Sequence, residues 1–155
     1  MSNVQKYLKP WSWSLMFLTF ITFVHLSCRK KEQPQQMKDH PVPSVPVQIT
    51  IYPNDPLNFK IQGIGGWMYL NGGINGIVLY RKSQQEFVAI ERTSTVYPEN
   101  AGAKIKVLSD NFTCLDTVSG SKWQIIDGTV IQGPANWALR QYGTSFDGTV
   151  LRIAN

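Results

Sequence analysis

Histidine and cysteine are scarce in this sequence, which has two of each among 155 residues. His25 lies in an apolar N-terminal stretch and His40 in a proline-rich stretch, so residues 47–155 contain no histidine and a single cysteine, Cys114. A Ser-His-Asp or Cys-His arrangement and an imidazole general base are therefore excluded for this region. A zinc site of the common Cys/His kinds and an internal disulfide are excluded as well.

Charge is also sparse, since charged residues make up 16% of the chain and basic residues exceed acidic ones by only 15 to 10. Five of the basic residues lie on either side of the N-terminal apolar stretch: Lys6, Lys9, Arg29, Lys30 and Lys31. Without these five the chain has as many basic as acidic residues, so the body of the protein is neutral. Because nucleic-acid binding requires a basic face on the folded part, we expect no nucleic-acid partner.

An uncharged apolar run occupies residues 11–26 and is preceded by two lysines. As a helix its 16 residues would span roughly 24 Å, short of the ~30 Å hydrocarbon core of a bilayer. The run ends in His25-Leu26-Ser27-Cys28, which resembles the lipobox of bacterial lipoproteins, where the chain is cut just before a lipidated cysteine. We therefore expect a signal peptide over residues 1–27 and lipidation of Cys28. An uncleaved membrane anchor and a plain signal peptide are the alternative interpretations.

Residues 28–46 are predicted to be the lipidated cysteine followed by a flexible, proline-rich tether, because the segment has few residues able to build a core. Two acyl chains or more on Cys28 would anchor the chain stably without a spanning helix. Arg29, Lys30 and Lys31 follow directly and favour a lipoprotein of the cell envelope that faces the periplasm.

From residue 47 onward, short apolar runs alternate with Gly, Pro, Asn and Asp. Such runs with a period of two predict half-buried strands, and Asn-Gly or Asp-Gly pairs predict the turns between them. No segment has sustained helical periodicity, so we expect an all-β domain over residues 47–155. The predicted strands are 47–52, 59–62, 67–70, 77–81, 87–91, 104–108, 112–115, 123–126, 129–132, 141–146 and 149–153.

The side chains that could take part in catalysis do not indicate an enzyme. Cys114 lies in an apolar strand pattern, which is typical of a small core residue rather than of a nucleophile. No glycine-rich stretch completes a dinucleotide or phosphate site, and spacing singles out no pair of carboxylates. The carboxylates of the body include Glu86, Glu91, Glu99, Asp110, Asp116, Asp127 and Asp147.

Several stretches, in order along residues 47–153, resemble a Rieske-type iron-sulfur domain of the form found in lipoproteins of Bacteroidetes. The resemblance implies three stacked antiparallel sheets with two loops at the tip, where the [2Fe-2S] cluster of that family is bound. The stretches that carry it are 65–81, 87–92, 120–123 with Asp127-Gly128, and Gly133-Pro134-Ala135 with Leu139 and Tyr142.

The sequence departs from this family at all four positions that would ligate the cluster: Ser94, Val96, Asp116 and Ser119. A Rieske centre requires two cysteines on one iron and two histidines on the other. We therefore expect no metal and no cofactor. Hydrogen bonds from Ser94, Thr95, Asp116 and Ser119 are expected to close the loops instead, with Val96 packed against Pro134.

The sequence thus favours a lipid-anchored cell-envelope protein with a Rieske-like domain that has lost its iron-sulfur ligands and has a non-catalytic binding or structural role. The tip loops, residues 92–103 and 116–122, are the candidate surface for an unknown protein partner, besides the membrane at Cys28. The alternative is a Rieske electron-transfer protein with atypical ligands.

Overall fold

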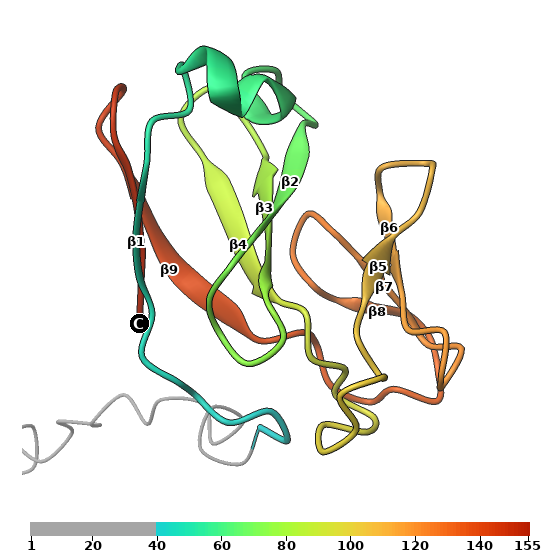
Figure 1. Ribbon diagram of the computed structural model, residues 1–155. Coiled ribbons are helices and arrows are strands. Elements are labelled where there is room, and N and C mark those ends of the chain that lie inside the picture. The colour runs from blue at the N-terminus through green and yellow to red at the C-terminus, as the bar shows by residue number, and fades with distance from the viewer. Residues whose placement is uncertain (1–39) are drawn as a thin grey trace, which may run out of the picture. The chain divides into compact units, whose positions relative to one another are not determined.

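The computed structural model describes residues 40–155, which form an all-β domain with ten strands and one 3-10 helix (Figure 1). The sheets are antiparallel: a six-stranded sheet in the order β1-β10-β9-β4-β3-β2 and a four-stranded sheet in the order β5-β6-β7-β8. The elements are β1 (Gln48–Ile51), η2 (Pro56–Ile61), β2 (Trp67–Leu70), β3 (Ile77–Arg81), β4 (Phe87–Glu91), β5 (Lys106–Val107), β6 (Thr113–Leu115), β7 (Lys122–Gln124), β8 (Val130–Gln132), β9 (Gln141–Phe146) and β10 (Leu151–Ala154).

The six-stranded sheet bends through β9, which takes part in two ladders. The start of β9 pairs with β4, through Tyr142 opposite Ala89, and the rest of the strand pairs with β10, through Phe146 opposite Leu151. β9 therefore joins the layer formed by β1 and β10 to the layer formed by β2, β3 and β4. With the four-stranded sheet as the third layer, the predicted arrangement of three stacked sheets is confirmed.

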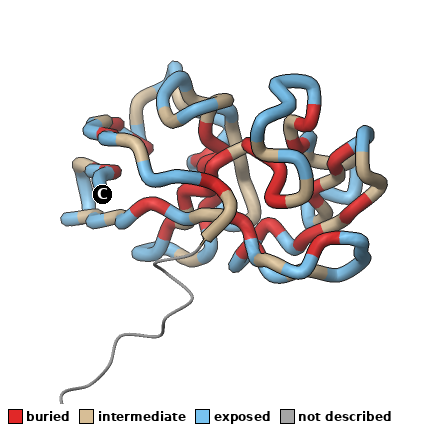
Figure 2. The backbone as a smooth tube through the Cα atoms, turned by 90° about the horizontal axis from the view of Figure 1, so that it is seen from below, coloured by how far each residue is buried: buried red, intermediate tan, exposed pale blue. Residues whose placement is uncertain are grey.

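The alternating side chains of β3 show how the layers stack. Ile77 and Leu79 belong to one core cluster, whereas Val78 and Tyr80 belong to the other, as the period of two along a strand requires. The middle layer is thus covered on both faces, and all five residues of β3 are buried. Figure 2 shows that buried segments (red) gather in the middle of the domain, whereas much of its periphery is exposed (pale blue).

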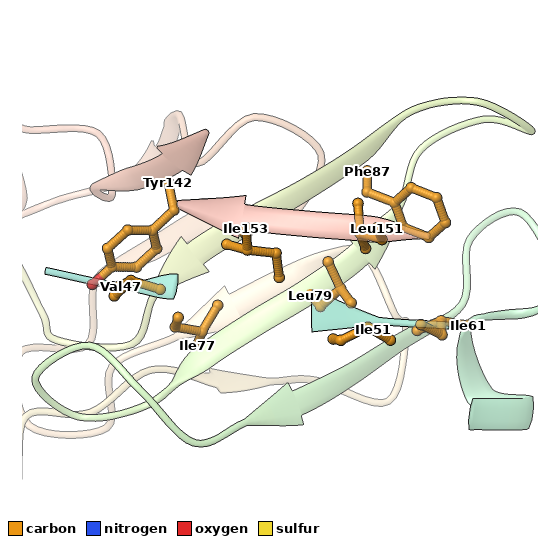
Figure 3. Close-up of a cluster of buried hydrophobic side chains, with 10 residues drawn as sticks. Val47, Ile51, Ile61, Ile77, Leu79, Phe87, Tyr142, Leu151 and Ile153 are labelled. Atoms are coloured by element: carbon orange, nitrogen blue, oxygen red, sulfur yellow. The ribbon is translucent and has the colours of Figure 1, made fainter. Parts of the chain in front are cut away.

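The first core lies between the layer of β1 and β10 and the middle layer, and its side chains meet across the bent sheet (Figure 3). The second core lies between the middle layer and the four-stranded sheet and is built around the fully buried Trp123. The first core comprises Val47, Ile51, Ile61, Ile77, Leu79, Phe87, Ala89, Tyr142, Leu151 and Ile153. The second comprises Val78, Tyr80, Ile90, Ile105, Cys114, Trp123, Ile125, Ala135 and Leu139.

The strand predicted over residues 59–62 is wrong, because this segment belongs to the 3-10 helix η2. Asp55 caps that helix by accepting a hydrogen bond from the N–H of Leu57 at 2.8 Å, and Pro56 supplies the helical φ at its start. Only Ile61 of this helix is buried. The cap and the proline thus determine a helical conformation here, although the short apolar run favours a strand.

The predicted boundary between tether and domain at residue 47 is also wrong, because residues 40–46 already pack on the domain. Val42 is fully buried, and its carbonyl accepts a hydrogen bond from Arg140 Nε at 2.7 Å. Asn155 holds the same segment through Ser44 Oγ and the Val45 carbonyl, both at 2.7 Å. Arg140 and Asn155, which flank the C-terminal strands β9 and β10, thus hold this proline-rich segment on the domain.

The predicted signal peptide, residues 1–27, and Cys28 lie outside the described residues. Among residues 40–155 no helix is long and apolar enough to cross a membrane.

Candidate functional site: the tip loops

The two tip loops, residues 92–103 and 116–122, meet beside the second core. The first loop follows β4, and the second connects β6 to β7. β4 brings Ser94 to the junction, while the β6–β7 hairpin brings Asp116, and both residues are fully buried. Residues separated by 22 positions in the sequence are thus held together by the stacking of the middle layer on the four-stranded sheet.

The carboxylate of Asp116 is the centre of the junction. Ser94 Oγ donates to Asp116 Oδ2 at 2.8 Å, and Ser119 Oγ donates to the same oxygen at 2.6 Å. The other oxygen, Oδ1, accepts from the N–H of Val118 at 2.9 Å. Three of the four positions that the resemblance assigns to cluster ligands are therefore joined to one another by hydrogen bonds, as the sequence predicted for Ser94, Asp116 and Ser119.

The turn after β6 explains why the hairpin presents Asp116 in this way. The Asp116 carbonyl accepts from the N–H of Gly120 at 2.8 Å, and Gly120 has a φ of +74°, which only glycine adopts freely. The carboxylate bonds back to the backbone two residues on, as aspartate commonly does in turns. Burial opposes ionisation of Asp116, but the hydrogen bonds from Ser119, Val118 and Ser94 outweigh it and lower the pKa of the carboxyl.

Thr95 and Val96, the other two residues expected to close the loops, make different kinds of contact. Thr95 Oγ1 donates to the carbonyl of Trp137 at 3.1 Å, so its predicted hydrogen bond links the first tip loop to the segment after β8. Val96 is half-buried and packs against the second core, whereas Pro134 is exposed. The peptide bond before Pro134 is cis, and the next residue, Ala135, donates its N–H to Ser121 Oγ at 3.0 Å.

The donor set of the tip does not fit a two-iron cluster. Val96 has no donor atom, and the hydroxyl and carboxylate oxygens of Ser94, Asp116 and Ser119 are hard ligands already paired with one another. A Rieske centre takes two thiolates and two imidazoles. Within residues 40–155 no group of three or more His, Cys, Asp or Glu side chains is arranged to hold a metal ion.

The one thiol and the one imidazole of the described domain lie outside the junction. Cys114 is fully buried in the second core, as predicted, and burial together with the charge of Asp110 raises the pKa of its thiol to about 12. His40 belongs to the packed domain and not to a free tether, which the sequence did not indicate. Its Nε2 lies 2.9 Å from the carbonyl oxygen of Ala138, and its ring meets Trp137 edge-on at 5.8 Å.

A second polar cluster, which no motif in the sequence indicates, is centred on Glu91 at the end of β4. The Glu91 side chain is fully buried and accepts hydrogen bonds from Tyr142 Oη at 2.6 Å, Thr93 Oγ1 at 2.8 Å, and the N–H groups of Ile74 and Asn75 at 2.9 and 3.0 Å. Burial opposes ionisation, but the hydrogen bond from Tyr142 and those from the loop outweigh it and lower the Glu91 pKa. Burial and the adjacent carboxylate raise the pKa of Tyr142.

This cluster fixes the loop between β2 and β3 and the start of the first tip loop. Gly73 has a φ of +64°, and a Cβ there would collide with Glu91 Oε2 and the Tyr142 hydroxyl. The only sign of this cluster in the sequence is an acidic residue at the end of an apolar strand, because the hydrogen-bond partners of Glu91 come from three separate segments. The role of the cluster is therefore structural: it stabilises the backbone next to the tip loops.

Comparison with known proteins supports the fold. No family model matches the sequence, and no curated protein matches it. Among solved structures, the chain is similar to the cyanobacterial plasma membrane Rieske protein PetC3 from Synechocystis PCC 6803, with a TM-score of 0.51 and 18% identity over 68% of this chain and 97% of that one. At this level of identity the likeness concerns architecture alone: the domain has a Rieske-like, all-β fold.

Proposed function

We propose that this chain is a lipid-anchored cell-envelope protein whose Rieske-like domain binds no cluster and works as a non-catalytic binding module. Its tip loops are the contact surface. The fold is that of electron-transfer domains, but function depends on the site and not on the scaffold.

The observation that carries the proposal is the hydrogen-bonded junction of Ser94, Asp116 and Ser119. In a Rieske domain the cluster lies between the two loops, whereas here the hydrogen bond from Ser94 to the Asp116 carboxylate joins them, and Ser119 and the Val118 N–H fix that carboxylate from within the second loop. No buried side-chain polar atom among the described residues lacks a hydrogen-bond partner. The junction is thus complete without a metal, which argues against an electron carrier with oxygen ligands at these positions.

Membrane attachment rests on the sequence around Cys28. The apolar run over residues 11–26 and the lipobox-like His25-Leu26-Ser27-Cys28 support export and lipidation. The Rieske protein of Synechocystis is a plasma membrane protein, which agrees with a location at a membrane. Arg29, Lys30 and Lys31 support an orientation toward the periplasm.

Surface chemistry supports contact at the tip. Tyr97 in the first loop and Val118 in the second are 49% and 48% exposed, and a hollow of about 650 Å³ runs along residues 96–101. Because the Asp116 junction already orders both loops, little conformational entropy remains to be lost on binding. An ordered surface with exposed apolar side chains favours a binding role.

The anchor is tested by expressing the full chain and a Cys28→Ala variant in a Gram-negative host and fractionating the cells. Wild type should remain in the membrane fraction, with a mature mass that starts at Cys28 and includes acyl chains. Cys28→Ala should lack that mass, and Cys114→Ala, which removes the buried thiol, should behave as wild type. Full-length, unacylated wild type would overturn the lipoprotein assignment.

The non-redox character is tested on the purified mature protein from cells supplied with iron. It should be colourless and contain no stoichiometric iron or acid-labile sulfide. Visible charge-transfer bands together with a Rieske-type electron paramagnetic resonance signal would overturn the proposal in favour of an electron carrier.

A further inference from the structure

The chain enters the described domain beside the tip loops. His40 contacts the carbonyl of Ala138 at 2.9 Å and the ring of Trp137 at 5.8 Å, and the Trp137 carbonyl is bound by Thr95 of the first tip loop. Figure 1 shows the start of the domain and the loop that follows β4 at the same end of the molecule. The helix η2 lies at the opposite end (Figure 1).

The length of chain before this point limits where the domain can lie. Cys28 and His40 are twelve positions apart, and even a fully extended chain of that length spans only roughly 40 Å. The limit is nearly the same if residues 11–26 are an uncleaved anchor, because that run ends two residues earlier. The tip is therefore the end of the domain that the covalent chain holds next to the membrane.

Exposed apolar side chains lie at the η2 end as well as at the tip, besides Phe112 and Ile131 elsewhere on the surface, and the tether distinguishes between the two ends. At the η2 end, Leu57 and Phe59 are 87% and 67% exposed. A domain of this size is roughly 35 Å across, so turning this end to the bilayer would require an almost fully extended tether, its least favourable arrangement in conformational entropy. The tip reaches the bilayer with the tether relaxed.

The tip also has the chemistry of a membrane interface. Tyr97 and Val118 are half-exposed there, and Trp137 is partly exposed beside His40. Tyrosine and tryptophan are favoured at the level of the lipid headgroups because their rings are apolar and their polar atoms reach water. Glu99 is the only exposed acidic residue of the two tip loops, since Asp116 is buried, so an anionic lipid surface meets little repulsion.

We propose that the tip loops rest on the lipid surface to which the chain is anchored, with the η2 end directed away from it. The inference rests on the proposed anchor at Cys28 and names the lipid surface as the partner of the tip. The short tether keeps the tip at a high effective concentration over the bilayer, so a weak contact suffices. The untethered domain should then bind vesicles poorly.

The experiment measures the distance of each end from the lipid in the full mature chain, reconstituted in phosphatidylethanolamine–phosphatidylglycerol vesicles. A fluorophore is placed at the tip through Thr117→Cys or at the far end through Leu57→Cys, both exposed positions. Cys114 is buried and should not react in the folded protein. Headgroup-labelled quencher lipid should quench the Thr117 fluorophore several-fold more than the Leu57 fluorophore.

A Tyr97→Ser, Val118→Ser double variant should reduce quenching at Thr117, whereas Phe59→Ser at the far end should leave it unchanged. Equal quenching at the two positions, or stronger quenching at Leu57, in protein that sediments with the vesicles would overturn this inference alone. That outcome would leave the tip free for a protein partner. Failure of the mature chain to sediment with vesicles would overturn the proposed anchor, and this inference with it.

Discussion

Replacement of Asp116 should loosen the tip more than any other single change in the loops. The carboxylate accepts three hydrogen bonds, from Ser94, Ser119 and the Val118 N–H, at 2.6–2.9 Å. Asp116→Ala leaves all three donors without their acceptor and removes the volume between the loops. Asp116→Asn keeps the shape and one acceptor oxygen but loses the charge.

The burial of the donors sets the size of the effect. Ser94 is fully buried and cannot regain a bond to water, whereas Ser119 and Val118 are partly exposed and can. A buried donor left unpaired costs about 1–3 kcal/mol, and a hydrogen bond to a charged group contributes about 1.5–3 kcal/mol. We expect a loss of unfolding free energy of about 3 kcal/mol for Asp116→Ala and about 1 kcal/mol for Asp116→Asn.

The assay is urea unfolding of the mature protein, followed by the fluorescence of the buried Trp123. For a domain of this size, a loss of about 3 kcal/mol lowers the urea midpoint by about 2 M. The matched control is Asp147→Asn, which changes an exposed turn carboxylate paired with Arg152 and should have a much smaller effect. Equal midpoints for wild type and both Asp116 variants would refute the reasoning.

The pH dependence provides a second check on the same variants. Because the folded-state pKa of Asp116 is lowered, its contribution is complete above the unfolded value of about 3.9 and is lost as the pH falls through the folded value. Asp116→Asn lacks this titration, so acidification from about pH 5 to 3 should destabilise it less than it destabilises wild type. An equal loss in both proteins would mean that the carboxylate is not ionised in the fold.

Tyr142→Phe removes one donor from Glu91 and raises the pKa of that carboxyl toward its unfolded value. Acid unfolding, followed by circular dichroism, should therefore begin at a higher pH than in wild type, and an unchanged acid transition would contradict this. Cys114 should not react with iodoacetamide at pH 8 until urea unfolds the protein, because it is buried and its pKa is raised to about 12; labelling of the native protein would be the opposite result. Arg81→Lys should lower the urea midpoint, with a loss of about 2 kcal/mol, because the buried guanidinium donates to four backbone carbonyls that an ammonium cannot reach together; a wild-type midpoint would contradict this.

The strands could be predicted well because their information is local. Apolar residues alternate along each strand, and Gly-containing turns such as Asp127-Gly128 and Asp147-Gly148 separate them; Gly128 and Gly148 both have positive φ. The segment at Phe59 could not be predicted from the period of its apolar residues, because a cap at Asp55 and the fixed φ of Pro56 determined its conformation. Short apolar runs are ambiguous in this way.

The tip junction could be predicted only through the resemblance, which placed Ser94, Asp116 and Ser119 at facing positions in a fold. Their side chains then left little choice of interaction, because a buried carboxylate needs donors and hydroxyls supply them. The Glu91 cluster had no such guide. Its donors at Asn75, Thr93 and Tyr142 lie up to 51 positions from Glu91 in the sequence and converge on it only when the sheets stack.

The central claim is that hydrogen bonds, and not a metal, hold the two tip loops together. Hydrogen–deuterium exchange at the amides of Val96 and Val118, which bond to Ser94 Oγ and Asp116 Oδ1 on either side of the Ser94–Asp116 hydrogen bond, tests this from both loops. The account predicts that the protection of both amides is the same with and without a strong iron chelator, and that Asp116→Ala lowers it in both loops. Loss of protection on chelation, with release of iron from the wild-type protein, would contradict the account.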